Sequence, residues 1–399
     1  MNKDIDYILS AQAVREKTAK LFDLTVAGKT NFEYHESKLE DVSKIVLEVI
    51  RENYPDLKIP FHSRWGHFQV GDVDRNSKLN KDLESLDAME KARTKLDLVI
   101  TSVLLDAGAG PNWSFEEEGK TFNRSEGLGV ASWHMFMNGA FSTDNSKRAD
   151  ATKLMSISGS DIEKSFQVSS SNPLVGVEGR AGLLASLGKC INSKADVFVG
   201  GRPGNILDYM KNKHGMEFAA TDLLKAVLTH FGDIWPSRIK VDGVSLGDVW
   251  SHPALGEKDD LNSLVPFHKL SQWLTYSLIE PFVEAGFTVH SVNNMTGLAE
   301  YRNGGLLIDS GLITLRDPKM MDVAHKPDSE IIIEWRALTV SLLDKIADIV
   351  RKELNFSEEE FPLAKVLEGG TWWAGRKLAK EKRVDLSPPL KLDSDGTVF

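Results

Sequence analysis

The sequence predicts a mostly α-helical fold, a single large helical domain with a few short strands. Apolar residues recur at helical spacing over many long stretches, whereas alternating β-branched runs are few. No internal repeat, low-complexity tract or Pro/Ser-rich linker divides the chain. We therefore expect one integrated domain over residues 1–399, within which a helical N-terminal lobe (1–150) and a C-terminal lobe (151–399) can be drawn.

The helices follow in order along the chain. "SKLEDVSKIVLEVIREN" places Leu39, Val42 and Val46 on one helical face, and Pro55 ends this N-terminal helical region. A loop is expected over 56–80, and a long helix over 81–107 that "GAGP" terminates. Further helices are predicted at 127–140, 148–168, 178–190, 204–212, 217–232, 266–286, 337–354 and 373–383.

Strand signals are confined to two stretches. "GLLIDSGLITL" (305–315) fits a hairpin or two short helical turns, and "SEIIIEW" (329–335) is β-branched enough for a strand. The second stretch runs directly into the helical "RALTVSLLDKIADIVRKEL". At the end of the chain "SDGTVF" (394–399) predicts a turn and then an apolar tail packed on the body.

Composition excludes several classes of protein. A formal charge of -10 disfavours binding to nucleic acid or to an anionic membrane, because both need a basic face. The longest apolar run, "LDLVITSVLL", is far shorter than the roughly 20 residues that span a bilayer. Cys190 is the only cysteine, which excludes an internal disulfide framework or a Cys-rich metal site. We expect a cytoplasmic protein.

Patterns for metals and cofactors are missing from the sequence. His62 and His67 are five apart, which does not place them on one helical face, and no HExxH pattern occurs. "GVEGRAG" (176–182) and "GGRPGN" (200–205) match neither the Walker A nor the dinucleotide pattern, and no GxSxG elbow is present. We therefore expect no metal and no cofactor, and disfavour both hydride transfer and nucleoside triphosphate chemistry.

The stretch "HSRWGHF" (62–68) has two interpretations. In the first, Trp65 and Phe68 fill the core while Arg64 and the histidines satisfy backbone carbonyls. In the second, the loop forms a polar pocket wall on which Arg64 presents its planar fork to an anion. Both interpretations stay open at the level of sequence.

Carboxylates remain as the candidates for chemistry. Those that stand among apolar or glycine residues are Asp106, Glu126, Asp248, Glu280, Glu300, Asp309, Glu334 and Glu368. Most such groups cap a helix or pair with an arginine. Glu300 differs because Tyr301 and Arg302 follow it, and a glycine pair then leaves room for a ligand near the backbone. "IIIEWRA" repeats the acid–aromatic–base order at Glu334 and Arg336.

Long motifs run through nearly the whole chain. They include "IPFHSRWGHFQVGDVDR", "SVLLDAGAGPNW", "FQVSSSNPLVGVEGRAGLL", "LGDVWSHP", "VPFHKLSQWLTYSLIEP", "TGLAEYRNGGLLIDSG", "IEWRALTV" and "LEGGTWWAGR". Together they resemble the uracil-catabolism protein family of fungi and bacteria, which carries a conserved domain of unknown function. The resemblance implies a role in a route that degrades uracil through a ribosylated intermediate, with ribosylurea on the way to urea.

A weaker resemblance concerns the order of motifs. It is similar to that of the queuosine-salvage N-glycosidases, helical enzymes akin to DNA glycosylases that release a base from ribose 5′-phosphate. "FHKLSQWL" puts Lys269 where that family has a lysine, "AEYR" puts Glu300 where it has an aspartate, and "IEWRALTV" matches at Glu334 and Arg336. The chain departs from the family pattern at Glu300, and at residues 303–305, where that family has a proline-containing sequence.

These resemblances imply hydrolysis of the N-ribosyl bond of a small ribosylated substrate. Glu300 would be the carboxylate beside the oxocarbenium-like carbon and Asp309 a second one. The groups expected to bind substrate, by clamping a phosphate, by stacking or by lining the site, are Arg64, His62, His268, Lys269, Trp273, Tyr301, Arg302, Glu334 and Arg336. Two alternatives stay open, a non-catalytic metabolite-binding or scaffold protein and an amidohydrolase acting on a ureide.

Overall fold

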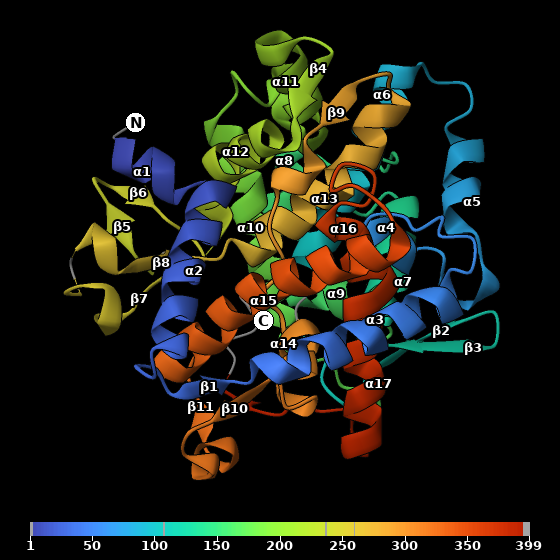
Figure 1. The fold of residues 1–399 in the computed structure, drawn as a ribbon. Helices are drawn as coiled ribbons and strands as arrows, with labels where there is room; N and C mark the ends of the chain where they lie inside the picture. The colour runs from blue at the N-terminus through green and yellow to red at the C-terminus, as the bar shows by residue number, and fades with distance from the viewer. Residues whose placement is uncertain (1–2, 107, 236–237, 259, 394–399) are drawn as a thin grey trace. The chain divides into compact units, whose positions relative to one another are not determined.

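The computed structural model describes residues 3–106, 108–235, 238–258 and 260–393 (Figure 1). Helices dominate this part of the chain, and its strands are short and associate in pairs. The prediction of a mostly helical fold with a few short strands is confirmed. No helix within the described ranges is both long and apolar enough to cross a membrane. The predicted packing of the tail 394–399 lies outside the described residues.

Contacts divide the chain into two compact units that interleave along the sequence. Unit 1 gathers Met1–His62, Arg238–Gln272 and Ser291–Val398. Unit 2 gathers Ser63–Ser237 and Trp273–His290. Helix α13 (Lys269–Glu284) begins in unit 1 and continues in unit 2. The single integrated domain with lobes meeting near residue 150 stays a prediction.

Unit 1 is built around α15 (Glu330–Leu354), which packs against α2, α3 and α14. Its helices are α1 (Lys3–Ile8), α2 (Ala11–Val26), α3 (Leu39–Asn53), α14 (Tyr301–Asp309), α15, α16 (Leu363–Val366) and α17 (Trp372–Lys382). Its antiparallel pairs are β1 (Phe32–Tyr34) with β10 (Ile313–Leu315), β5 (Lys240–Val241) with β6 (Val244–Ser245), and β7 (Val249–Ser251) with β8 (Leu264–Pro266). A parallel pair joins β11 (Ala324–His325) to β12 (Lys391–Leu392).

The predicted strand at 329–335 is wrong, because this stretch forms the first turns of α15. Ile331, Ile332 and Ile333 are all buried, so their β-branched side chains satisfy the core from a helix as well as they would from a strand. The helix-forming sequence that follows extends without a break into them, since adding residues to an existing helix costs less than starting one. The stretch 305–315 contains the last residues of α14 and then strand β10, instead of the expected hairpin or two short helical turns.

Unit 2 packs around α6, whose residues from Thr94 to Leu104 are all buried. Its helices are α4 (Arg64–His67), α5 (Arg75–Asp82), α6 (Ala88–Leu104), α7 (Arg124–Met137), α8 (Ala151–Ser156), α9 (Gly159–Ser165), α10 (Val177–Ser193), α11 (Ile206–His214) and α12 (Ala220–His230). The strand pairs are β2 (Ser114–Glu117) with β3 (Lys120–Asn123), antiparallel, and β4 (Glu217–Ala219) with β9 (Thr288–His290), parallel.

Side-chain caps explain where two predicted helices of unit 2 were too long. Asp87 accepts the backbone N–H of Glu90, so α6 starts at residue 88 rather than 81. Ser158 and Asp161 form a capping box that splits the predicted 148–168 helix into α8 and α9. The expected loop 56–80 also holds the short α4 and most of α5.

Candidate functional site

Glu300, the predicted catalytic carboxylate, caps the start of α14. Its side chain accepts the backbone N–H of Arg302 at 2.7 Å and that of Asn303 at 2.5 Å. The side chain is buried, with 7% of the residue exposed. Two N–H groups and the positive end of the helix dipole therefore hold this carboxylate in one orientation.

The guanidinium of Arg302 forms no ion pair with the adjacent Glu300 within the described residues. Arg302 instead donates from Nη1 to the carbonyl of Leu386 at 2.9 Å and lies 4.9 Å from the ring centre of Tyr301. Glu300 makes no ion pair with Arg or Lys within the described part of the chain. The printed partners of its carboxylate are backbone N–H groups, which distinguishes Glu300 from Asp106, Asp248 and Asp309, each of which pairs with an arginine.

Close packing fixes the position of α14 against its neighbours. A Cβ at Gly375 of α17 would lie 2.1 Å from the carbonyl oxygen of Arg302, and a Cβ at Gly304 would lie 2.8 Å from the ring of Trp335. The Trp335 indole donates to the carbonyl of Gly304 at 2.9 Å. Glycine at these two positions lets α17 and α15 approach the first turn of α14.

Two buried polar atoms in this group of helices have no hydrogen-bond partner among the described residues. They are Oδ1 of Asn303, on the first turn of α14, and Oγ1 of Thr371, on the π-helical turn Leu367–Thr371 that α14 contacts. An unsatisfied buried polar atom costs about 1–3 kcal/mol. Both residues are fully buried, so this cost is not relieved by exposure to solvent.

Glu368, on the same π-helical turn, pairs with a histidine from the segment before α4. His62 Nδ1 lies 2.7 Å from Oε2 of Glu368, and the hydroxyl of Tyr54 donates to Glu368 at 3.4 Å. Burial and the neighbouring Glu368 charge raise the pKa of Tyr54 well above its usual range. π-Helical turns inside α-helices occur frequently at functional sites. A carboxylate that orients a histidine is a common arrangement for proton transfer.

Asp309, the second predicted carboxylate, is held in an ion pair at the end of α14. Arg383 donates to it through both Nη atoms, one of them at 2.8 Å. The hydrogen bond and charge of Asp309 raise the pKa of Arg383 further. This fork-to-carboxylate geometry fixes both side chains and is typical of a structural ion pair.

Arg336 is likewise bound to a carboxylate. It donates to Asp248 from both Nη atoms, at 2.8 and 2.7 Å, and Asp248 also accepts the backbone N–H of Lys269 at 3.0 Å. Buried His268 has a left-handed backbone (φ 49°) and shares a 2.8 Å hydrogen bond between Nε2 and the carbonyl of Ile8. These contacts anchor the start of α13 and thereby place Lys269.

Glu334 meets His252 and a loop amide rather than an arginine. The carboxylate accepts both the backbone and the side-chain N–H of Asn31, at 2.9 and 3.2 Å, and lies 3.2 Å from His252 Nε2. Oxygen and nitrogen atoms of His252, Glu330 and Glu334 lie within 4.8 Å of one another, close enough to hold a metal. However, His252 Nδ1 accepts the Ala254 N–H, so Nε2 carries the proton and has no lone pair to offer.

Arg64 and Trp273 meet in unit 2. The guanidinium carbon of Arg64 lies 5.6 Å from the Trp273 ring centre, Nη1 donates to Asp106 at 2.7 Å, and Nε donates to Ser102 at 2.7 Å. Arg64 is fully buried, and its Nη2 has no hydrogen-bond partner within the described ranges. Trp65 and Phe68 are buried as the core-filling interpretation expects, while Arg64 binds a carboxylate rather than only carbonyls.

Comparison with known proteins identifies the family. The sequence model described as "Protein of unknown function (DUF1688)" matches residues 7–399. The chain belongs to the DUF1688 family. It is 38% identical to "Uracil catabolism protein 4" of Lachancea kluyveri over the full length of both chains. It is 39% identical to "Protein urg3" of Schizosaccharomyces pombe over 98% of each chain.

In this DUF1688 protein the carboxylates could be singled out from the sequence, but the residues that pair with them could not. Asp106, Asp248 and Glu368 were each noted as carboxylates among apolar or glycine residues, and each now has a defined cationic or histidine partner. Arg383 and His252 were missed. Their only sequence signals are a basic residue near the C-terminal end and a histidine before a proline, and neither indicates a partner so distant along the chain.

Proposed function

We propose that this chain acts in uracil catabolism as an enzyme that hydrolyses the N-ribosyl bond of a ribosylurea-type or pyrimidine ribonucleoside, free or 5′-phosphorylated. The printed name of the Lachancea kluyveri relative supports the pathway. The similarity of motif order to queuosine-salvage N-glycosidases supports the bond. The proposal places the enzyme in the cytoplasm, in keeping with its single cysteine.

One observation carries the choice of residue: Glu300 is a buried carboxylate held by peptide N–H groups without an arginine. Asp106, Asp248 and Asp309 each face an arginine, which cancels their charge. A carboxylate that keeps its negative field can stabilise the positive charge that develops on the anomeric carbon. Because a carboxylate has about four acceptor positions, its two hydrogen bonds leave others for a water or a substrate hydroxyl.

The departing nitrogen needs a proton, and the His62–Glu368 pair is our candidate to provide it. Glu368 lies on the π-helical turn that packs against α14, the helix that Glu300 caps. A carboxylate on one ring nitrogen of a histidine sets the orientation of the ring, so the 2.7 Å contact with Glu368 fixes how His62 lies. In this scheme Glu300 stabilises the cation or orients the attacking water, and His62 assists departure of urea or of the base.

Product analysis tests the reaction. Carbon-13 NMR of the purified protein with ribosylurea, and separately with its 5′-phosphate, should show a free-ribose or ribose 5-phosphate anomeric signal together with urea. An amidohydrolase would instead release ammonia or carbon dioxide and leave the ribosyl bond intact. Binding without any product from either compound would contradict the proposal and favour a metabolite-binding role.

Glu300→Gln tests the residue. The substitution preserves shape and removes the charge, so we expect turnover to fall at least about 10²-fold. Loss of one capping bond should cost only about 1 kcal/mol of unfolding free energy, measured by urea titration. Glu353→Gln is the matched control, because it removes an exposed carboxylate near the end of α15. A Glu300→Gln protein as active as the control would show that Glu300 serves only as a helix cap.

A further inference from the structure

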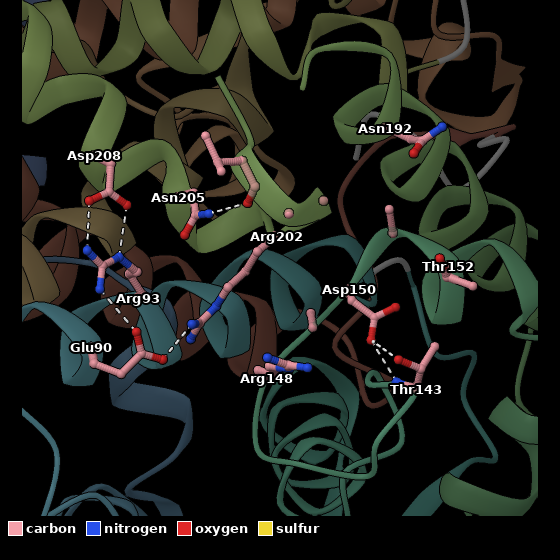
Figure 2. Close-up of a pocket in the computed structure, with 15 residues that line it drawn as sticks. Glu90, Arg93, Thr143, Arg148, Asp150, Thr152, Asn192, Arg202, Asn205 and Asp208 are labelled. Carbon is pink, nitrogen blue, oxygen red and sulfur yellow. Dashed lines mark hydrogen bonds and ion pairs between the residues drawn. The ribbon is translucent and has the colours of Figure 1, made fainter. Parts of the chain in front are cut away.

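A cavity of about 720 Å³ lies in unit 2, and part of its wall is the "GGRPGN" stretch that matches no nucleotide-binding pattern (Figure 2). Arginines reach it from three separate segments: Arg93 from α6, Arg148 from the loop before α8, and Arg202 from the loop before α11. None of the residues assigned to hydrolysis lines this cavity. Its volume falls in the range of small-molecule binding sites.

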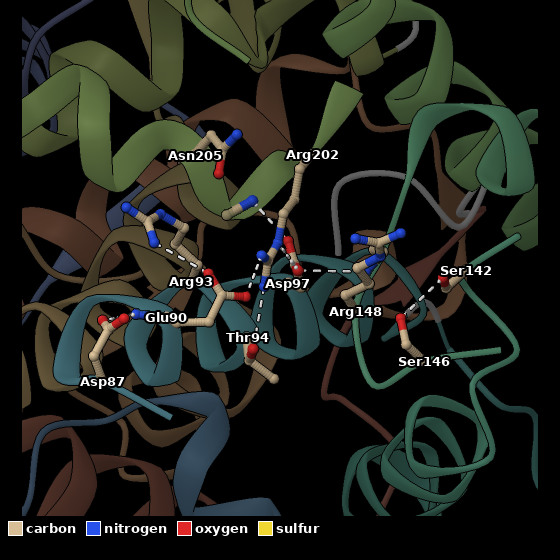
Figure 3. A network of polar contacts seen from close by, with 12 residues as sticks. Asp87, Glu90, Arg93, Thr94, Asp97, Ser142, Ser146, Arg148, Arg202 and Asn205 are labelled. Atoms are coloured by element: carbon tan, nitrogen blue, oxygen red, sulfur yellow. Dashed lines mark hydrogen bonds and ion pairs between the residues drawn. The ribbon is translucent and has the colours of Figure 1, made fainter. Parts of the chain in front are cut away.

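A chain of alternating charges forms one side of the cavity (Figure 3). Arg93 donates to Asp208 at 2.8 and 2.7 Å and to Glu90 at 3.0 Å. Glu90 also accepts from Arg202, at 2.5 Å, and Arg202 continues to Thr94 at 3.1 Å. The chain holds two guanidinium groups in fixed orientations.

Asp97 joins the two segments that carry Arg202 and Arg148. This fully buried carboxylate accepts Arg202 Nε at 2.6 Å, the backbone N–H of Gly204 at 2.7 Å and that of Ala149 at 3.3 Å. Ala149 directly follows Arg148 in the sequence. The separation between the backbones that carry the two arginines is therefore set by a buried group and not by surface loops alone.

Several N–H donors around the cavity have no protein acceptor among the described residues. Both oxygens of Glu90, Asp208 and Asp150 already accept hydrogen bonds. A guanidinium has five N–H groups, and Arg148 uses a single one in its hydrogen bond to the exposed Asp144 at 2.7 Å. Arg93 and Arg202 also keep N–H groups without a protein acceptor among the described residues. The cavity thus offers surplus N–H donors to an acceptor-rich ligand.

We propose that this cavity binds a small phosphorylated sugar or polyol, with Arg148 and Arg202 on the phosphate. A single guanidinium satisfies a planar carboxylate, whereas two from separate segments suit the three oxygens of a phosphate monoester. The rest of the wall includes Thr152, Asn192 and Asn205, whose hydroxyl and amide groups fit a hydroxyl-bearing body better than an aromatic one. Gly200 has open space where a Cβ would stand, which leaves its backbone accessible.

Isothermal titration calorimetry with ribose 5-phosphate, inorganic phosphate and ribose tests the site. We expect ribose 5-phosphate to bind more tightly than inorganic phosphate, and ribose to bind far more weakly than either. Arg148→Gln should weaken binding of ribose 5-phosphate about tenfold or more, because a charge-assisted pair is lost. The Arg148→Lys protein keeps the charge but loses the planar fork, so its affinity for ribose 5-phosphate should lie between those of the wild type and Arg148→Gln.

Lys147→Gln is the matched control. Lys147 precedes Arg148, pairs with Asp82 and does not line the cavity, so this variant changes the charge by the same amount without touching the site. If Lys147→Gln and Arg148→Gln weakened ribose 5-phosphate binding equally, the effect would come from the overall charge of the protein. That result would overturn the proposal. Absence of ribose 5-phosphate binding to the wild-type protein at millimolar concentration would overturn it as well. Ribose 5-phosphate is also a product of the proposed hydrolysis of a phosphorylated substrate, so the assignment to this cavity depends on the loss caused by Arg148→Gln. The proposed hydrolysis uses other residues and does not predict that loss.

Discussion

Asp248 in unit 1 is a partly enclosed carboxylate and Asp97 in unit 2 a fully buried one. Both bind an arginine, yet their acidities move in opposite directions. Burial opposes ionisation of Asp248, but the charge and paired hydrogen bonds of Arg336 hold its pKa well below the usual range. Burial dominates at Asp97 and raises its pKa to about 6, although Arg202 and two backbone N–H groups act against the rise.

Geometry accounts for the difference. Arg336 gives both Nη atoms to Asp248, while Arg202 gives only Nε to Asp97 and shares its remaining contacts with Glu90 and Thr94. The side chain of Asp97 is also fully enclosed, whereas 14% of the Asp248 side chain is exposed. A nearby arginine therefore overcomes the cost of burial only when its charge is undivided and its fork is matched to the carboxylate.

The largest expected effect concerns Asp248 and Arg336, the pair in which both Nη atoms of the guanidinium bind the carboxylate. Asp248→Asn should lower the unfolding free energy by about 3–5 kcal/mol at pH 7, because Arg336 is left buried without its counter-charge. Asp97→Asn should cost less, since Arg202 keeps Glu90 as a partner. Urea unfolding of both variants measures the two costs side by side. If Asp97→Asn lost as much unfolding free energy as Asp248→Asn or more, the proposed difference between the two arginine pairs would be contradicted.

The pH dependence of stability should separate the two sites next. The folded pKa of Asp97 lies above its unfolded value, so the native state binds the proton more tightly, and stability should fall as pH rises from about 4 to about 6. A shift from 3.8 to about 6 corresponds to roughly 3 kcal/mol. Asp248 has the opposite sign: its contribution is complete above about pH 4 and is lost as pH falls further.

The wild-type protein and Asp97→Asn, unfolded in urea at a series of pH values between 4 and 7, provide the measurement. The difference between their unfolding free energies should change across this window and then level off. Asp248→Asn should show no such change over the same range. A flat difference for Asp97→Asn would mean that its carboxyl titrates at its ordinary pKa.

Local sequence predicted most of the helices but not the contacts between distant segments. Helical periodicity and caps depend on neighbouring residues, so α3, α10 and α15 could be anticipated. The pairing of β1 with β10 joins segments nearly three hundred residues apart and leaves no local pattern. The strand expected at 329–335 failed because β-branched propensity is weak beside a long adjoining helix.

In the candidate site, too, features that depend on neighbouring residues were predictable and contacts between distant segments were not. Tyr301, Arg302 and the glycine pair marked Glu300 from the sequence, since all four are its neighbours. Capping by Glu300 was a general expectation for such carboxylates, but the destination of Arg302 was not predictable, because Leu386 lies 84 residues away. The Asp309–Arg383 and Asp248–Arg336 pairs span 74 and 88 residues, so only folding reveals which carboxylates are neutralised.

The smallest expected effect tests why the pKa values of Asp97 and Asp248 move in opposite directions. Glu90→Gln removes the competing carboxylate from Arg202, so the guanidinium charge should act more fully on Asp97. The pKa of Asp97, followed by carbon-13 NMR of its carboxyl carbon, should then fall below the wild-type value of about 6. Stability at pH 7 should change by less than about 1 kcal/mol, because Glu90 is partly exposed. Asp87→Asn, a neighbouring charge change on the N-cap of α6, is the control and should leave Asp97 unmoved. If Glu90→Gln instead raised the pKa, division of the Arg202 charge could not be the reason why burial wins at Asp97 and loses at Asp248.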